Sequence, residues 1–176
     1  MPRPSVATER RAEILEAFEA CALRKGLQAT TLADVAEEAG LPRPLVRHFM
    51  GNRDDMVAGL IERMMERAID DIEQALAAAE PASANSQLQI ILSRTFMDPV
   101  TNRLMVQLWQ QSWQDKKLHA RLEDVYRRCV EQIHDRLFPE PTPTSYDLAY
   151  AVSALALGNA VFDQFNVRPV AEDALL

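Results

Sequence analysis

The sequence predicts an all-α protein in which a three-helix N-terminal unit is joined by a long helix to a second all-helical unit. Three observations lead to this prediction. Apolar residues make up 48% of the 176 residues, yet only five residues are glycine. Apolar positions recur at helical spacing along most of the chain. This composition disfavours a β-sandwich, whose many turns would need more glycine.

The first helix is expected from about Glu9 to Lys25. Thr8 is a suitable N-cap, and Gly26 follows two basic residues of the last turn. One apolar stripe runs along this helix and consists of Ile14, Leu15, Phe18, Cys21 and Ala22. The helix is therefore expected to pack over the two short helices that follow.

Two short helices joined by a tight turn are expected between Thr30 and Arg53. Thr30 and Thr31 offer N-cap oxygens to the first helix. Gly40 ends that helix, because glycine readily takes the left-handed conformation of a sharp turn. The second helix is expected to begin near Pro42, since proline is tolerated in a first helical turn. Two helices arranged in this way are typical of a helix-turn-helix DNA-binding motif.

Charge is distributed unevenly along the chain. The net charge is −7, but residues 1–55 carry eight Lys/Arg against nine Asp/Glu, whereas residues 56–176 carry eleven against seventeen. The stretch from Gly40 to Arg53 holds three arginines and no acid. Screening limits the reach of distant charges to about 8–10 Å, so phosphate oxygens are the expected complement of this stretch.

The remaining helices follow from caps and apolar periodicity. Asn52 is expected to cap a long helix with apolar positions from Met56 to Leu76, and residues 80–86 form a loop. Further helices are expected at about 88–96, 101–114, 118–137 and 146–165, with a break at Pro139–Pro143. This long fourth helix would join the two units.

Several classes of protein are disfavoured. No apolar run reaches eighteen residues and the N-terminus has no signal-peptide core, so a cytoplasmic protein without membrane contact is expected. Cys21 and Cys129 lack metal-type spacing, and no metal or cofactor is expected. Glu131 and His134 have the spacing of a di-iron bundle motif, but only one copy occurs. We therefore expect no catalytic residues and no enzyme.

Residues 8–60 resemble the DNA-binding domain of TetR/AcrR-family transcriptional regulators. The residues that carry the resemblance are Thr31, Val35, Ala36, Ala39, Gly40, Leu41, Arg43, Pro44, Val46, His48, Phe49, Gly51, Asn52, Arg53 and Met56. Two positions depart from the family, which often has tyrosine at Arg47 and tyrosine or histidine at Phe49. Residues 96–133 resemble, more weakly, the BetI-like subset that includes choline-responsive repressors of betaine synthesis.

The resemblance implies a DNA-binding domain at residues 1–52 and an effector-binding and dimerisation domain at 53–176. It also implies a homodimeric repressor that binds a near-palindromic double-stranded operator and is released by a small-molecule inducer. The family closes with two long helices that pair across the dimer. Since only residues 146–165 form such a helix here, either the last helix is short or the chain is incomplete.

Eight residues are expected to contact DNA: Arg43, Pro44, Leu45, Arg47 and His48 in the major groove, and Thr30, Thr31 and Arg53 on phosphates. The alternative for each arginine is a solvated surface charge, and for His48 a position facing the protein. A helical binding or scaffolding protein that no longer reads DNA is the alternative for the whole chain.

Eight further residues are expected to surround an inducer: Phe96, Met105, Trp109, Trp113, Tyr126, Asn159, Phe162 and Asp163. Tryptophan faces attract quaternary ammonium groups, so the expected ligand is apolar or cationic. The alternative is that these residues serve ordinary core or dimer packing.

Overall fold

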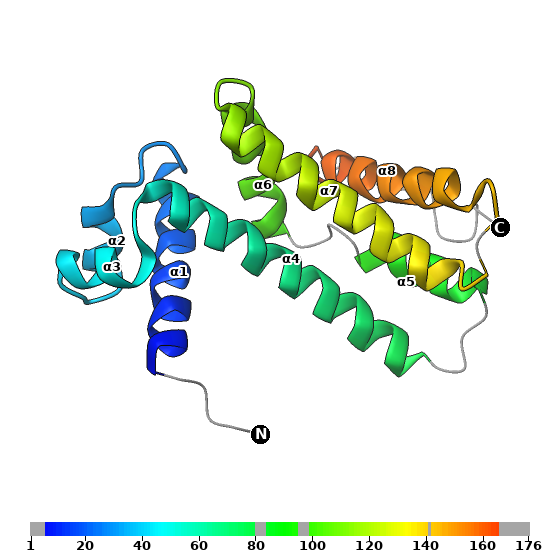
Figure 1. Cartoon of the computed structure of the whole chain (residues 1–176), viewed down its shortest axis with the longest axis horizontal. Helices are drawn as coiled ribbons and strands as arrows, with labels where there is room; N and C mark the ends of the chain where they lie inside the picture. Colours follow the sequence, from blue (N-terminus) through cyan, green and yellow to red (C-terminus); the bar gives the residue numbers. More distant parts are fainter. Residues whose placement is uncertain (1–5, 80–83, 95–98, 141, 166–176) are drawn as a thin grey trace.

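The computed structural model describes residues 6–79, 84–94, 99–140 and 142–165 (Figure 1). Within these ranges the chain forms eight helices and no strand, which confirms the all-α prediction. The helices are α1 (Val6–Lys25), α2 (Leu32–Glu38), α3 (Arg43–Met50), α4 (Arg53–Ala78), α5 (Ala84–Arg94), α6 (Pro99–Ser112), α7 (Lys116–Leu137) and α8 (Ser145–Gln164).

Helices α1 to α3 form a compact group at one end of the molecule, which we call the reader unit (Figure 1). Thr31 caps α2 in a capping box with Asp34, and Gly40 turns the chain with φ +62°. Pro42 is the N-cap of α3, and Pro44 lies in its first turn. The predicted start of α1 is wrong: the helix already includes Val6, and no glycine or proline between Val6 and Thr8 interrupts it.

The long α4 leaves the reader unit and runs beneath the remaining helices (Figure 1). Asn52 caps it as predicted, because its side chain accepts from the Asp55 N–H while the Asp55 carboxylate accepts from the Asn52 N–H. Its 26 residues span roughly 39 Å at a rise of 1.5 Å per residue. This single helix therefore belongs to both units.

One apolar core runs through both units. In the reader unit it contains the fully buried Ile14, Phe18 and Val46, and it continues through Leu60 of α4 to Leu108 of α6. A smaller cluster lies farther away and joins Ile91, Val130, Ile133 and Ala149. A shift of α4 or α6 would therefore alter the packing of the reader unit.

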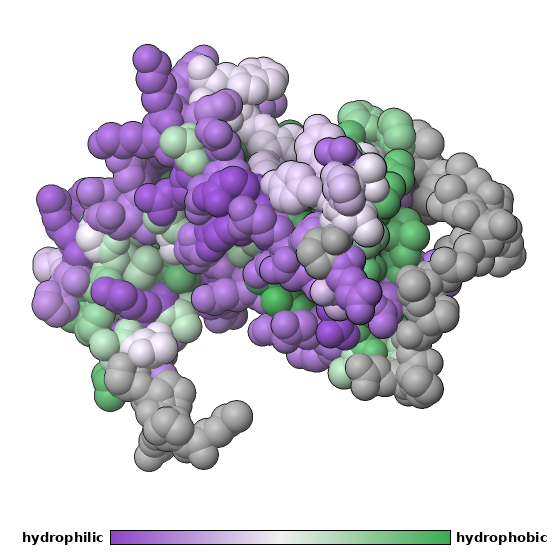
Figure 2. Space-filling view, turned by 45° about the vertical axis from the view of Figure 1, so that its right-hand side comes forward, coloured by the Kyte–Doolittle hydropathy of each residue, from purple (hydrophilic) through white to green (hydrophobic). Residues whose placement is uncertain are grey.

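Helices α5 to α8 cover the distal part of α4. Asp115 caps α7 by accepting from two backbone N–H groups, and α5 begins four residues earlier than predicted, at Ala84. Helix α8 and the residue after it expose large apolar side chains: Tyr146, Leu148, Tyr150, Leu155 and Phe162 on the helix, and Phe165 just beyond it. Figure 2 shows apolar surface on this right-hand side of the molecule. Among the helices described, none is both long and apolar enough to span a bilayer.

Candidate DNA-binding surface and ligand cavity

Helix α3 has one exposed face and one buried face. Arg43, Pro44, Arg47 and His48 are exposed, and their spacing places them on the same side of the helix. Val46 and Met50 point into the core, with Val46 completely buried. We call the four exposed residues the recognition face. Leu45, which was expected in the groove, is half-buried beside it.

The recognition face carries cations that the rest of the protein does not neutralise. Within the described ranges, neither Arg43 nor Arg47 forms an ion pair, and α3 itself contains no acid. Near its C-terminal end, the Phe49 carbonyl accepts a hydrogen bond of 3.1 Å from Arg11 Nε. Because the arginines are free of carboxylates, they can bind phosphate oxygens or guanine edges without breaking an existing pair.

The position of Thr30 contradicts the prediction that it contacts a DNA phosphate. It is 2% exposed, and its hydroxyl donates to the Gly26 carbonyl at 2.8 Å. Its side chain is therefore internal and does not reach a phosphate. Thr31 is exposed, but its hydroxyl donates to Asp34 Oδ2 at 2.6 Å and accepts from the Asp34 N–H.

The Asp34 carboxylate is held by three groups. Lys25 Nζ lies 2.7 Å from it, and both the hydroxyl and the backbone N–H of Thr31 donate to it. These contacts, that of Lys25 first, hold the pKa of Asp34 well below its usual range. The start of α2 is therefore fixed by a charged capping box.

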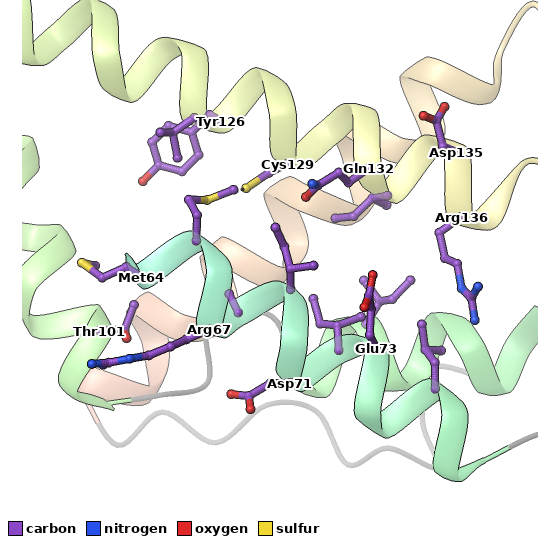
Figure 3. Close-up of a pocket in the computed structure, with 18 of the residues that line it drawn as sticks. Met64, Arg67, Asp71, Glu73, Thr101, Tyr126, Cys129, Gln132, Asp135 and Arg136 are labelled. Atoms are coloured by element: carbon purple, nitrogen blue, oxygen red, sulfur yellow. Dashed lines mark hydrogen bonds between the residues drawn. The ribbon is translucent and has the colours of Figure 1, made fainter. Parts of the chain in front are cut away.

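A cavity of about 730 Å³ lies between α4 and α7, with α5 and α6 contributing to its wall. Figure 3 shows Tyr126, Cys129 and Gln132 projecting from α7 toward α4, whereas Asp135 turns away. Most of the wall is aliphatic or sulfur-containing: Ile61, Met64, Met65, Ile69, Ile72, Leu76, Ile91, Met105, Val125, Cys129 and Ile133. The volume suits a drug-sized ligand.

Two polar groups of α7 are fixed in this apolar wall. The Tyr126 hydroxyl accepts a 2.6 Å hydrogen bond from Trp109 Nε1. Burial raises the pKa of Tyr126, and this hydrogen bond opposes the rise. Burial also raises the pKa of the Cys129 thiol to about 11, and its sulfur lies 3.5 Å from Met65 Sδ. The thiol is thus protonated at neutral pH.

One cavity residue is bound to the reader unit. Arg67 of α4 lines the cavity, and its two terminal nitrogens donate to the two carboxylate oxygens of Glu19 in α1, at 2.8 and 2.7 Å. Glu19 is 6% exposed, and Arg63 Nε lies 3.8 Å from it. The wall of the cavity and the first helix of the reader unit therefore share one ion pair.

The predicted inducer residues are only partly brought together. Met105 and Tyr126 line the cavity, and Trp109 lies behind Tyr126. Trp113 is 81% exposed because α6 ends at Ser112 and leaves it in the turn, so it does not line this cavity.

The α8 candidates do not line the cavity either. Phe162 is 56% exposed on the outer side of α8 and is not part of the cavity wall. Asn159 is half-buried and outside the cavity wall. Phe96 and the side chain of Asp163 lie outside the described residues.

Sequence reasoning missed the contribution of α4 to the cavity. Met64, Ile69, Ile72 and Leu76 were used only to define a connecting helix, although all four line the cavity. A signal was present, because an apolar pattern that continues far beyond the reader unit needs a second surface to pack against.

Comparison with known proteins finds relatives in sequence and in fold. No family model matches the chain. The HTH-type transcriptional regulator BetI of Burkholderia ambifaria strain MC40-6 is 27% identical over 143 residues, which are 80% of this chain and 72% of that protein. A TetR-family transcriptional regulator from Rhodococcus sp. superimposes with a TM-score of 0.78 at 18% identity, over 94% of this chain and 91% of that one. The chain thus resembles BetI-type transcriptional regulators in sequence and has the fold of TetR-family regulators.

Another solved structure with a similar fold contains a bound ligand. It is a transcriptional regulator from Saccharomonospora viridis in complex with choline. Its TM-score is 0.72 at 21% identity, with 95% of this chain and 91% of that chain covered. At this identity the likeness concerns the fold, namely a helix-turn-helix unit followed by a helical unit.

Proposed function

We propose that this chain is a homodimeric cytoplasmic repressor of the TetR family, rather than an enzyme, whose recognition face binds a near-palindromic operator and is released by a small molecule. The observation that carries the proposal is the exposed face of α3, on which Arg43 and Arg47 stand without a carboxylate partner among the described residues. In this proposal Arg43, Arg47 and His48 read base edges, while Arg53 positions the unit on a phosphate. Thr31 fixes the start of α2 instead, because its hydroxyl and its N–H both donate to Asp34.

The apolar outer side of α8 supports the dimer. Leu155 is 60% exposed and Phe162 is 56% exposed, and exposed apolar patches commonly mark protein contacts when they are contiguous. The reader unit lies at the opposite end of the molecule from α8 (Figure 1). Pairing through α8 would therefore leave both copies of α3 free to enter major grooves about one helical turn apart, roughly 34–36 Å.

The cavity supports release by an apolar, drug-sized ligand. The regulator from Saccharomonospora viridis was solved with choline, but quaternary ammonium cages use several aromatic faces. Tyr126 is the one aromatic residue among those lining the present cavity in the described part of the chain. The exposed side chains of Glu73 and Gln132, both lining residues, are placed to meet a polar group of such a ligand (Figure 3).

Release requires only that the ligand bind one arrangement of the helices better than another. A ligand in the cavity contacts α4, whose first turn follows α3 directly and whose Arg67 holds Glu19 of α1. Widening the space between α4 and α7 would thus change the position of the reader unit and the separation of the two recognition helices.

The experiment is a fluorescence-anisotropy titration of labelled duplexes that tile the upstream region of the gene. Wild type is compared with Arg43→Ala/Arg47→Ala and with Arg103→Ala/Arg121→Ala, a control that removes two exposed arginines outside the reader unit. We expect tight, salt-dependent binding to one near-palindromic tile, lost only in the first variant. Equal and weak binding of all three proteins to every tile would instead support a helical scaffolding protein that does not read DNA.

A separate measurement tests the dimer. Sedimentation equilibrium of the wild type is expected to give twice the chain mass, and Leu155→Asp is expected to give the chain mass, because it places a charge in the proposed α8 interface. A monomeric wild type at micromolar concentration would contradict the homodimer.

A further inference from the structure

The backbone N–H and C=O of Leu27 bind residues that are far from it in sequence. Its N–H donates to Gln107 Oε1 of α6 at 2.5 Å. Its carbonyl accepts from Arg53 Nη2, on the first residue of α4, at 2.7 Å. The Leu27 side chain is completely buried in the core. The two peptide groups that flank Leu27 are therefore held, one by the helical unit and the other by the start of α4.

The backbone at this point is shaped for the contact. Gly26 precedes Leu27 and has φ +94°, a conformation that L residues rarely adopt. A Cβ atom at Gly26 would lie 3.8 Å from Gln107 Oε1. That distance is an ordinary van der Waals contact, so the glycine is required by its positive φ, which turns the chain sharply after α1 and presents the Leu27 N–H to α6.

The two partners of Leu27 have different surroundings. Gln107 is on the same helix as Thr101 and Met105, both of which line the cavity. Two residues separate Arg53 from the end of α3, and Arg53 is only half-buried, so its side chain remains partly accessible. A guanidinium has five N–H donors, and the Leu27 carbonyl occupies one.

We propose that Gln107 is a positioning residue for Arg53: it fixes the backbone of Leu27 through its N–H, and the Leu27 carbonyl in turn aims the free edge of the Arg53 guanidinium at a DNA phosphate. This inference rests on the proposed DNA-binding function. Because Gln107 moves with the cavity wall, ligand-driven displacement of α6 withdraws the support from Arg53. The link does not pass through the recognition face itself.

A double-mutant cycle tests the proposal. Gln107→Met and Gln107→Ala remove the acceptor of the Leu27 N–H, whereas Gln107→Glu keeps an oxygen acceptor at the same place. Gln110→Met is the matched control, since Gln110 is an exposed residue one turn along the same helix. Each variant is combined with Arg53→Met, and operator affinity is measured by anisotropy over a series of salt concentrations.

The expected loss of operator affinity in Gln107→Met and Gln107→Ala is about two- to tenfold, the range of one hydrogen bond. The slope of log affinity against log salt should fall by up to about 0.9 per protomer, because one phosphate contact is weakened. Gln107→Glu and Gln110→Met are expected to bind like wild type. In the Arg53→Met background, loss of Gln107 should have no further effect.

Amide proton exchange gives a second readout in the free protein. The Leu27 amide is expected to exchange faster in Gln107→Met and Gln107→Ala and at the wild-type rate in Gln107→Glu. Additive effects of Gln107 and Arg53, or an unchanged salt slope, would overturn the inference alone. Absence of operator binding by wild type would overturn the proposed function and the inference together.

Discussion

The ion pair between α1 and α4 gives a quantitative prediction for Glu19→Gln. The Glu19 side chain is 8% exposed and takes both terminal nitrogens of Arg67. Glutamine has nearly the same shape but no charge: its carbonyl oxygen can still accept from Arg67, whereas its NH2 group would face a guanidinium nitrogen that cannot accept a hydrogen bond. The substitution therefore removes the charge partner while leaving the two arginines in place.

The expected loss in the free energy of unfolding depends on how exposed the Arg67 side chain is. Removing one member of a fully buried pair costs about 3–5 kcal/mol. The Arg67 side chain is 39% exposed and can regain water, so we expect a loss of about 2 kcal/mol in the free energy of unfolding. For a chain of this length that corresponds to a fall in Tm of about 4–8 °C.

Thermal unfolding followed by circular dichroism measures this effect. Glu16→Gln is the matched control, because Glu16 lies one turn earlier on α1, 3.9 Å from Arg63, with a side chain that is 76% exposed. Its expected effect is below about 0.5 kcal/mol. Equal Tm values for the two variants would refute the reasoning that burial, rather than proximity of charge, makes the Glu19 contact stabilising.

Two further predictions concern a thiol and a helix cap. Because burial raises the pKa of Cys129 from 9.0 to about 11, the folded state holds the thiol proton more tightly. At pH 8 its alkylation by iodoacetamide, followed by peptide mass spectrometry, should be about 100-fold slower than that of an unfolded control. The rate should rise up to pH 11, and a plateau near pH 9 would contradict the burial. Asn52→Ala should lower the free energy of unfolding by about 1 kcal/mol through loss of the α4 cap, whereas Asn52→Asp should not; equal denaturant midpoints for both variants would show that the cap contributes nothing.

The reader unit could be predicted from sequence because its signals are local. The capping boxes of Thr31 with Asp34 and of Asn52 with Asp55 each lie within four residues, and both are present. Gly40 supplies the positive φ that the turn needs. The exposed positions of Arg43 and Arg47 also follow from the period of a single helix.

The cavity could not be predicted in the same way, because it depends on how separate helices pack. Trp109 and Trp113 share one face only if their helix continues, but α6 ends between them. Helix α8 is apolar on several sides, so its sequence does not reveal that Phe162 faces outward. Gln107 carries no sequence signal at all, since its partner is the backbone of a residue eighty positions away.

Protection of guanine N7 from methylation by dimethyl sulfate is the most direct test that the recognition face reads DNA. With wild type on its operator, we expect protected guanines in two clusters related by a two-fold axis and separated by about 10–10.5 base pairs. Arg47→Ala should lose protection at one symmetry-related position in each cluster and keep the others. Tight binding that protects no guanine, or a pattern unchanged in Arg47→Ala, would contradict the assignment of α3 as the recognition helix.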